Sequence, residues 1–246
     1  MNTTNKTALI TGGGSGIGFE IAKQLVAKGN KVIITGRTEA KLKAAADEIG
    51  AAYFTADINK PADTDALKNF LLAEFGGLDV LINNAGHAYY YQPGPDADAA
   101  TKAADEFQTN FFSAVRLTEE LLPLLQKSAE AAIVNVTSIV ALVPSTIIST
   151  YSASKAALHS YTQTLRYALS KTTNIKVFEL MPPLVNTAFS AEIGGENGIP
   201  PAEVADTLLH GFENDVYEIH TGNTAGIHAL AYAPTYNDAF LALNER

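Results

Sequence analysis

The chain has 246 residues, 47% of them hydrophobic and 17% charged, a composition that suits one globular domain with a sizeable core. Its formal net charge of −9 argues against non-specific nucleic-acid binding, which needs clustered lysine and arginine. Since there is no cysteine, disulfides, thiolate nucleophiles and cysteine-based metal sites are excluded.

Neither metal sites nor membrane segments are evident in the sequence. None of the five histidines has the spacing of a metal-binding pair such as H-E-x-x-H, so we expect no metal site. The start, Met1–Lys6, lacks the apolar region of a secretory signal, and no stretch approaches the roughly 18 apolar residues of a membrane span. We therefore expect a cytoplasmic protein that acts on small molecules and binds neither nucleic acid nor membrane.

Short runs rich in β-branched residues alternate with longer helix-patterned segments. The runs lack in-out alternation, which predicts strands covered on both faces. The predicted strands are Thr7–Thr11, Lys31–Thr35, Ala51–Thr55, Val80–Asn83, Ala132–Thr137 and Lys176–Met181. The predicted helices are Gly16–Lys28, Glu39–Ile49, Ala62–Glu74, Asp105–Gln126 and Thr150–Lys171. This alternation predicts an α/β fold, a single doubly wound domain over residues 1–246 with helices on both faces of a parallel sheet.

Two segments interrupt the alternation. Tyr89–Ala100 contains Pro93-Gly-Pro95 and is predicted as a loop, and Ala188–Pro201 is predicted as a flexible excursion that forms a short substrate lid. Both follow the carboxyl end of a strand, where ligands bind in open α/β sheets. An ordinary surface loop is the alternative for each.

A glycine turn, Thr11-Gly-Gly-Gly-Ser-Gly-Ile-Gly18, joins the first strand to the first helix. Glycines at this place let the backbone approach a pyrophosphate, and the helix N-terminus supplies free N–H groups and a partial positive charge. The turn therefore predicts dinucleotide binding, although a tight connection without a ligand has the same sequence.

Arg37 follows the second strand, where NAD-binding sites carry a carboxylate for the ribose 2′-hydroxyl about twenty residues after the turn. An arginine can bind a 2′-phosphate through charge-assisted hydrogen bonds, so we expect NADP(H) to be preferred over NAD(H). A solvated arginine at the start of a helix is the alternative.

The fifth strand ends near Ser138, and Tyr151 and Lys155 follow at i, i+4 spacing on one face of a helix. Reduction of a carbonyl needs a proton donor for the developing alkoxide, and a nearby ammonium lowers the pKa of a tyrosine. The three residues therefore predict an acid/base site built on Tyr151.

With these motifs the chain resembles the short-chain dehydrogenases/reductases, roughly from Lys6 to Gly222. Asn83-Asn-Ala-Gly86 matches the N-N-A-G signature of that family, and Ser138, Tyr151 and Lys155 match its catalytic residues. The resemblance implies a Rossmann-type domain with a mostly parallel seven-stranded sheet. It also implies an oxidoreductase in which Ser138 orients the carbonyl, Tyr151 transfers the proton and Lys155 also holds the nicotinamide ribose.

Further site residues follow from the same resemblance. It implies that Asn110 shapes its helix and holds a relay water, so the catalytic set is Asn110, Ser138, Tyr151 and Lys155. The implied cofactor-binding residues are Gly12, Gly14, Ser15, Gly16, Ile17, Gly18, Arg37, Asp57, Ile58, Asn84, Ala85, Gly86, Tyr151, Lys155 and Thr187.

The chain departs from the family pattern at two places. Met181-Pro-Pro183 replaces the usual Pro-Gly after the sixth strand, which is similar to a branch labelled DltE-like. Residues 223–246 form a C-terminal tail in place of the usual glycine-rich end, which puts the usual tetramer in doubt. We still expect a homodimer or larger oligomer, because the helices Asp105–Gln126 and Thr150–Lys171 are apolar around more than one face.

The substrate side is expected to be apolar and uncharged. Its predicted residues are Val140, Leu142, Pro144, Leu184, Val185 and Phe189, with Tyr89, Tyr90 and Tyr91 at the mouth. His87 could face the substrate, and the alternative for His87 and for the tyrosines is a partly exposed loop side chain. This pocket predicts a small neutral carbonyl compound or its alcohol as substrate. A non-catalytic NADP-binding sensor or a scaffold on the same fold is the alternative function.

Overall fold

The computed structural model describes residues 1–234, and the part of the predicted tail at 235–246 lies outside the described residues. Its strands form one sheet in the order β3-β2-β1-β4-β5-β6-β7, and every neighbouring pair is parallel. The strands are β1 (Thr7–Thr11), β2 (Lys31–Gly36), β3 (Ala52–Thr55), β4 (Val80–Asn83), β5 (Ala132–Val136), β6 (Lys176–Met181) and β7 (Glu218–His220). The predicted α/β class and seven-stranded sheet are confirmed.

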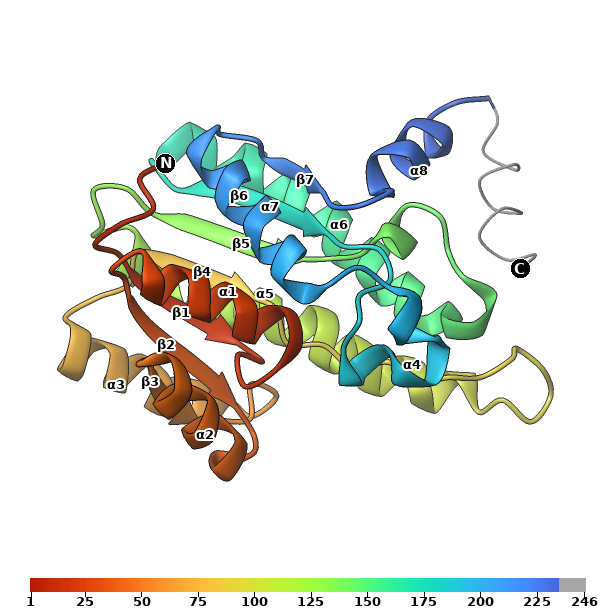
Figure 1. Ribbon diagram of the computed structural model, residues 1–246, viewed down its shortest axis with the longest axis horizontal. Coiled ribbons are helices and arrows are strands. Elements are labelled where there is room, and N and C mark those ends of the chain that lie inside the picture. Colours follow the sequence, from red (N-terminus) through yellow and green to blue (C-terminus); the bar gives the residue numbers. More distant parts are fainter. Residues whose placement is uncertain (235–246) are drawn as a thin grey trace.

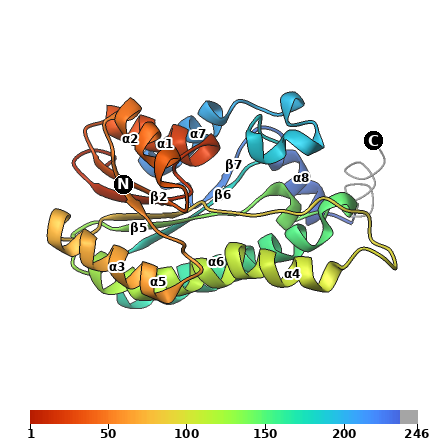
Figure 2. The same cartoon turned by 90° about the horizontal axis from the view of Figure 1, so that it is seen from below.

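Helices cover both faces of the sheet (Figure 2). One face carries α1 (Gly16–Ala27), α2 (Glu39–Ile49) and α7 (Pro201–Glu213). The other face carries α3 (Pro61–Phe70), α4 (Ala99–Phe107), α5 (Ser113–Leu125) and α6 (Ser149–Thr172). Alternate residues of β1 supply the two cores, since Ala8 and Ile10 belong to the cluster that includes α1 and α7, and Leu9 to the cluster that includes α5.

The helix predicted over Asp105–Gln126 begins earlier and is interrupted. It starts as α4 at Ala99, and a π-helical turn over Gln108–Phe112 connects it to α5. The predicted loop therefore ends at Asp98, whose φ is 47°. The prediction of this start was wrong because the apolar residues in the first two turns of α4 are alanines, and the one residue of α4 that is fully buried is Glu106.

The sheet places a binding cleft at the carboxyl ends of β1 and β4. These strands are adjacent, but the chain leaves β1 toward β2 on one side and leaves β4 toward β5 on the other. Such a switch point opens a crevice where α/β sheets bind ligands. The predicted lid, residues 188–201, lies over this end as two short 3-10 turns, η5 (Ala188–Ile193) and η6 (Gly195–Asn197).

The chain continues beyond the lid through α7 and β7 into α8 (Thr224–Ala231), which lies beside the end of β7 (Figure 1). This helix is the described part of the predicted tail. None of the helices in residues 1–234 is long and apolar enough to cross a bilayer.

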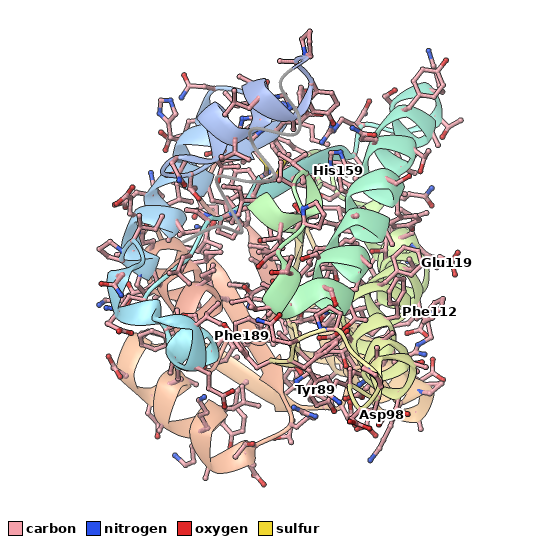
Figure 3. All side chains as sticks on the ribbon, turned by 90° about the vertical axis from the view of Figure 1, so that its right-hand side faces the viewer. Tyr89, Asp98, Phe112, Glu119, His159 and Phe189 are labelled. Carbon is pink, nitrogen blue, oxygen red and sulfur yellow. The ribbon has the colours of Figure 1, made fainter. Side chains whose placement is uncertain are left out.

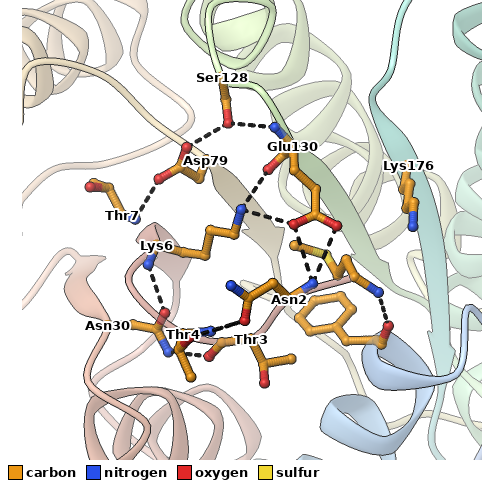
Figure 4. Close-up of polar contacts among 12 residues, drawn as sticks. Asn2, Thr3, Thr4, Lys6, Thr7, Asn30, Asp79, Ser128, Glu130 and Lys176 are labelled. Carbon is orange, nitrogen blue, oxygen red and sulfur yellow. Dashed lines mark hydrogen bonds and ion pairs between the residues drawn. The ribbon is translucent and has the colours of Figure 1, made fainter.

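The opposite end of the sheet is held by polar contacts of the N-terminal segment (Figure 4). Asp79 accepts hydrogen bonds from the backbone N–H of Thr7 at 2.8 Å and from the Ser128 hydroxyl at 2.5 Å. Lys6 forms an ion pair with Glu130 at 3.0 Å. These contacts fix the amino ends of the strands, far from the cleft at their carboxyl ends.

Candidate active site

The glycine turn joins β1 to α1 in a conformation that favours glycine. Gly12 and Gly16 have φ values of 66° and 57°. A β-carbon on Gly18 would lie 2.5 Å from Asn84 Nδ2, so this glycine lets α1 pack against the segment that follows β4. No side chain caps α1, and its first turn has no acidic residue, which leaves its N–H groups available to a phosphate. The turn therefore fits a pyrophosphate.

A cavity of about 830 Å³ opens at the carboxyl ends of the strands. It contains every predicted cofactor-binding residue except Gly18: Gly12, Gly14, Ser15, Gly16, Ile17, Arg37, Asp57, Ile58, Asn84, Ala85, Gly86, Tyr151, Lys155 and Thr187. Ser138 lines the same cavity, whereas Asn110 is 1% exposed and lies outside its lining.

Arg37 is exposed at one end of this cavity, with Thr38 and Lys41 beside it. Among residues 1–234 no carboxylate forms an ion pair with Arg37. Lys41 also lies close to the glycine turn, since a β-carbon on Gly14 would be 3.7 Å from its Cγ. The sequence analysis did not identify Lys41, although its position one helical turn after Arg37 was an available signal.

Ser138, Tyr151 and Lys155 come together at the centre of the cavity. Ser138 follows β5, and its hydroxyl accepts a hydrogen bond from the N–H of Val140 at 3.3 Å and lies beside the Tyr151 phenol. Lys155 is 3% exposed, donates a hydrogen bond to the carbonyl of Val136 at 2.8 Å, and lies 5.6 Å from the centroid of the Tyr151 ring. The pairing of β5 with β6 and the i, i+4 spacing on α6 thus assemble the arrangement that the sequence predicts.

The protonation of these groups differs from the expectation. Burial raises the pKa of Tyr151, an effect that the hydrogen bond from Ser138 only partly offsets. Burial also lowers the pKa of Lys155 to about 8. The expected lowering of the Tyr151 pKa by Lys155 was therefore wrong for the protein alone, because desolvation of the phenolate dominates. The phenol is held in its protonated form, which is the form that donates a proton.

Asn110 lies in the π-helical turn and connects three segments. Its Nδ2 donates hydrogen bonds to the carbonyl of His87 at 2.8 Å and to Ser154 Oγ at 2.9 Å. Its Oδ1 accepts one from the N–H of His87 at 2.7 Å. Asn110 therefore fixes the segment after β4 against α6, at the residue that directly precedes Lys155.

Glu106 is a second buried polar residue next to this site, and the sequence analysis missed it. It is 0% exposed, and its Oε1 accepts a hydrogen bond from the N–H of Tyr89 at 2.7 Å. Its Oε2 has no hydrogen-bond partner within residues 1–234. Its charge contributes to the raised pKa of Tyr151.

The Pro182-Pro183 pair packs between neighbouring segments. The carbonyl of Pro182 accepts a hydrogen bond from the N–H of Ile139 at 3.0 Å. Gly222, with φ 53°, approaches so closely that a β-carbon there would lie 3.1 Å from Pro183 Cγ. Thr187, which precedes the lid, lies beside Gly16. A β-carbon added to Gly16 would lie 3.2 Å from Thr187 Cγ2. The lid therefore meets the glycine turn.

The substrate end of the cavity is apolar, as expected, but its residues differ in part from the prediction. Of the predicted set, the cavity is lined by Val140, Leu184, Val185, Phe189 and Tyr90. It is not lined by Leu142, Pro144, Tyr89 or Tyr91, and additional lining comes from Ile147, Ile148 and Ile193. Figure 3 shows Phe189 on the lid and Tyr89 on the segment after β4.

Three residues of the segment after Gly86 have polar partners outside the cavity: His87, Tyr89 and Tyr91. The hydroxyl of Tyr89 donates to Asp105 at 2.8 Å, and that of Tyr91 donates to Thr150 at 2.9 Å. His87 Nε2 lies 3.3 Å from Asp105 Oδ2, and its side chain is 37% exposed. For these three residues the structure matches the alternative of a loop side chain.

Comparison with known proteins places these features in one family. The sequence profile of the family described as short chain dehydrogenase matches residues 6–198. An uncharacterized oxidoreductase, DltE of Bacillus subtilis, is 36% identical over 250 aligned positions that cover 99% of this chain and 98% of that protein. A fatty acyl-CoA reductase of Acinetobacter baylyi is 34% identical and covers 98% of this chain and 85% of its own length.

Solved structures agree with this grouping. A short chain dehydrogenase of Burkholderia cenocepacia in complex with NADP superposes with a TM-score of 0.86 at 25% identity, covering 98% of each chain. A Burkholderia phymatum dehydrogenase in complex with NAD has a TM-score of 0.87 at 23% identity, covers 100% of this chain and 98% of its own, and shows the fold alone. The chain belongs to the short-chain dehydrogenase/reductase family of oxidoreductases, in which it resembles the DltE-like branch.

Proposed function

We propose that this protein is an NADP(H)-dependent reductase that converts a small neutral carbonyl compound into its alcohol. The observation that carries the proposal is the Tyr151 phenol, held protonated by burial in a cavity that Ser138 and Lys155 also line. NADPH supplies the hydride when it is bound. The opposite reaction uses the same groups in reverse.

Each candidate catalytic residue has a separate task in this reaction. Ser138 donates a hydrogen bond to the carbonyl oxygen and orients it. Tyr151 transfers its phenolic proton to that oxygen as it becomes an alkoxide, and the phenolate is left behind. Lys155 stabilises this phenolate and binds the nicotinamide ribose. Asn110 keeps the segment after β4 in place beside Lys155.

The preference for NADPH rests on charge at the adenine end. Arg37 and Lys41 both line the cavity there, and Arg37 has no ion-pair partner among the described residues. Two cations suit a 2′-phosphate, which carries negative charge and accepts several hydrogen bonds. The related dehydrogenase of Burkholderia cenocepacia, solved with NADP, supports this choice.

A neutral substrate is supported by the distribution of charge along the cavity. Its charged lining residues are Arg37, Lys41, Asp57 and Lys155. The first three lie at the adenine end, and Lys155 is assigned to Tyr151 and the ribose. An anionic substrate would find no cation around Val140, Leu184 and Phe189, at a cost of several kcal/mol.

The experiment is a substrate panel in which NADPH and NADH oxidation are followed separately. The panel contains short ketones and aldehydes, keto acids of matched size, and a long-chain acyl-CoA. We expect the highest kcat/KM for a compact neutral carbonyl with NADPH. Higher values for the keto acids would contradict the neutral pocket. NADPH binding without turnover of any compound would favour the sensor, and no binding at all would favour the scaffold.

A further inference from the structure

Three side chains with metal-binding groups meet where the chain passes from β7 into α8. Glu218 and His220 are two residues apart on β7 and share a face of that strand, and His228 comes from α8. A carboxylate oxygen of Glu218 and a ring nitrogen of each histidine lie within 4.8 Å of one another. The sequence analysis expected no metal site, because this spacing across a strand and a helix follows no common motif.

The two histidines lack the partners that partly buried imidazoles normally have. His220 Nε2 is buried and has no hydrogen-bond partner among residues 1–234. The centroids of the His220 and His228 rings are 4.5 Å apart and the ring planes are inclined by 37°, so the two imidazoles lie next to each other.

Two carboxylates, each with a basic partner, lie at this end of β7. Glu218 lies directly beside the fully buried Glu179 in the pairing of β7 with β6. Glu179 binds the ring of His159 at 2.9 Å, and Arg166 donates to Glu218 Oε1 at 3.0 Å. Arg166 is the one permanent cation in this group, and its bond orients the Glu218 carboxylate while Oε2 can still act as a ligand.

We propose that Glu218, His220 and His228 bind a divalent transition-metal cation, with Zn²⁺ as the best match and a water as the fourth ligand. Two imidazoles with one carboxylate form a ligand set that zinc uses. Zinc bonds of about 2.0–2.2 Å place ligand atoms closer together than 4.8 Å, so small side-chain rotations complete the site.

Such an ion would hold α8 against β7. Ile227, next to His228, packs against the cluster formed by Ile139, Val140 and Ile148, and Val140 lines the substrate end of the cavity. A bound metal would therefore stabilise the wall of the cavity from outside. This role does not depend on the proposed reaction.

The test uses the untagged full chain, stripped with EDTA and dialysed. We expect it to bind one equivalent of Zn²⁺ by calorimetry, and one of Co²⁺ with the visible absorption of a four-coordinate site. At a hundredfold excess of Zn²⁺ over Kd, Tm should rise by about 5–10 °C. His220→Ala and His228→Ala should each weaken binding at least tenfold. Glu218→Gln should also weaken Zn²⁺ binding, although the glutamine side chain still offers Arg166 a hydrogen-bond acceptor.

His210→Ala is the matched control, because it removes an exposed histidine of α7 that is outside the cluster. Its Zn²⁺ affinity should equal that of the unmodified chain. Absence of stoichiometric binding in the unmodified chain would overturn the proposal. Binding that survives all three cluster substitutions, or that His210→Ala abolishes, would place the ion elsewhere and would also overturn it.

Discussion

At the scale of single residues, Arg37 determines which cofactor fits. Replacing Arg37 with Ala removes the cation expected to bind the 2′-phosphate, and charge-assisted hydrogen bonds of this kind contribute about 1.5–3 kcal/mol. The KM for NADPH should therefore rise at least tenfold, while that for NADH changes by less than about threefold. Steady-state kinetics with both cofactors measures the two values.

The control for this prediction is Lys31→Ala, which removes an exposed positive charge at the opposite end of β2. It should change neither KM. If the unmodified protein binds NADH more tightly than NADPH, the cofactor preference proposed from Arg37 is wrong.

Lys155 sets the pH dependence of the reduction. Burial lowers its pKa to about 8, so the ammonium is lost as pH rises through that value in the free enzyme. Because the same burial raises the pKa of Tyr151, the phenol stays protonated over this range. The value of kcat/KM for reduction should therefore fall above about pH 8.

The variant Lys155→Arg provides the comparison, since its guanidinium stays protonated throughout this range. Its rate should be lower, but the decline near pH 8 should disappear. A pH profile of the unmodified enzyme that stays flat to pH 10, about the ordinary lysine pKa, would show that Lys155 is not the titrating group.

The sequence predicted some of these residues because their spacing is local. Tyr151 and Lys155 are four residues apart on one helix, and the glycines of the turn follow β1 directly. Glu106 could not be identified in the same way, because its importance arises from complete burial and from the N–H of Tyr89, seventeen residues away. Long-range contacts of this kind have no local sequence pattern.

At the scale of elements, the lid depends on a close contact between Gly198 and the chain after β6. A β-carbon on Gly198 would lie 2.7 Å from the carbonyl of Leu184, and Val185 forms a bridge with Ile199 beside it. Gly198→Ala should therefore displace the lid at a cost of about 1–3 kcal/mol. Since Leu184 and Val185 line the cavity, the substrate KM should rise several-fold.

Gly94→Ala serves as the control, because no atom lies within 4 Å of a β-carbon at that loop position. In Gly94→Ala, the stability measured by thermal unfolding and the substrate KM measured by steady-state kinetics should equal those of the unmodified protein. Equal stability and equal KM for Gly198→Ala and the unmodified protein would show that the contact does not hold the lid.

The elements also show why the predicted boundaries differ from those observed. Strands buried on both faces and helices with apolar stripes were placed within about two residues, as is usual for such patterns. The exceptions were α7, β7 and α8, for which no bounds were predicted, α4, whose fully buried residue is the carboxylate Glu106, and the π-helical turns, which leave no periodic signal. The cluster of Glu218, His220 and His228 likewise exists only once β7 and α8 are folded together.

At the scale of the whole molecule, two large aromatic side chains are exposed next to α5 and on α6, the helices from which an oligomer was predicted. Phe112 is 52% exposed just before α5, and Tyr167 is 69% exposed on α6. The leucines from which an oligomer was predicted are mostly buried within the chain itself, among them Leu121, Leu124 and Leu125. The predicted homodimer therefore rests on the exposed aromatic residues.

We predict a dimer at micromolar concentration that Phe112→Asp dissociates, because a charge would have to be buried in the interface. Sedimentation velocity measures the mass of each form. Val216→Asp, a comparable change at a residue 42% exposed in the turn before β7, should leave the dimer intact. A monomer mass for the unmodified chain at micromolar concentration would contradict the prediction.

The central claim, that this protein reduces a carbonyl compound with Tyr151 as the acid, is tested most directly by comparing Tyr151→Phe with the unmodified enzyme. The substitution keeps the ring and its contact with Phe189, and removes the phenolic hydroxyl that would donate the proton. With the best substrate of the panel, kcat should fall at least a hundredfold while the Kd for NADPH changes by less than about twofold. A variant that retains more than about 5% of kcat with NADPH binding unchanged would mean that another group supplies the proton, and would contradict the account.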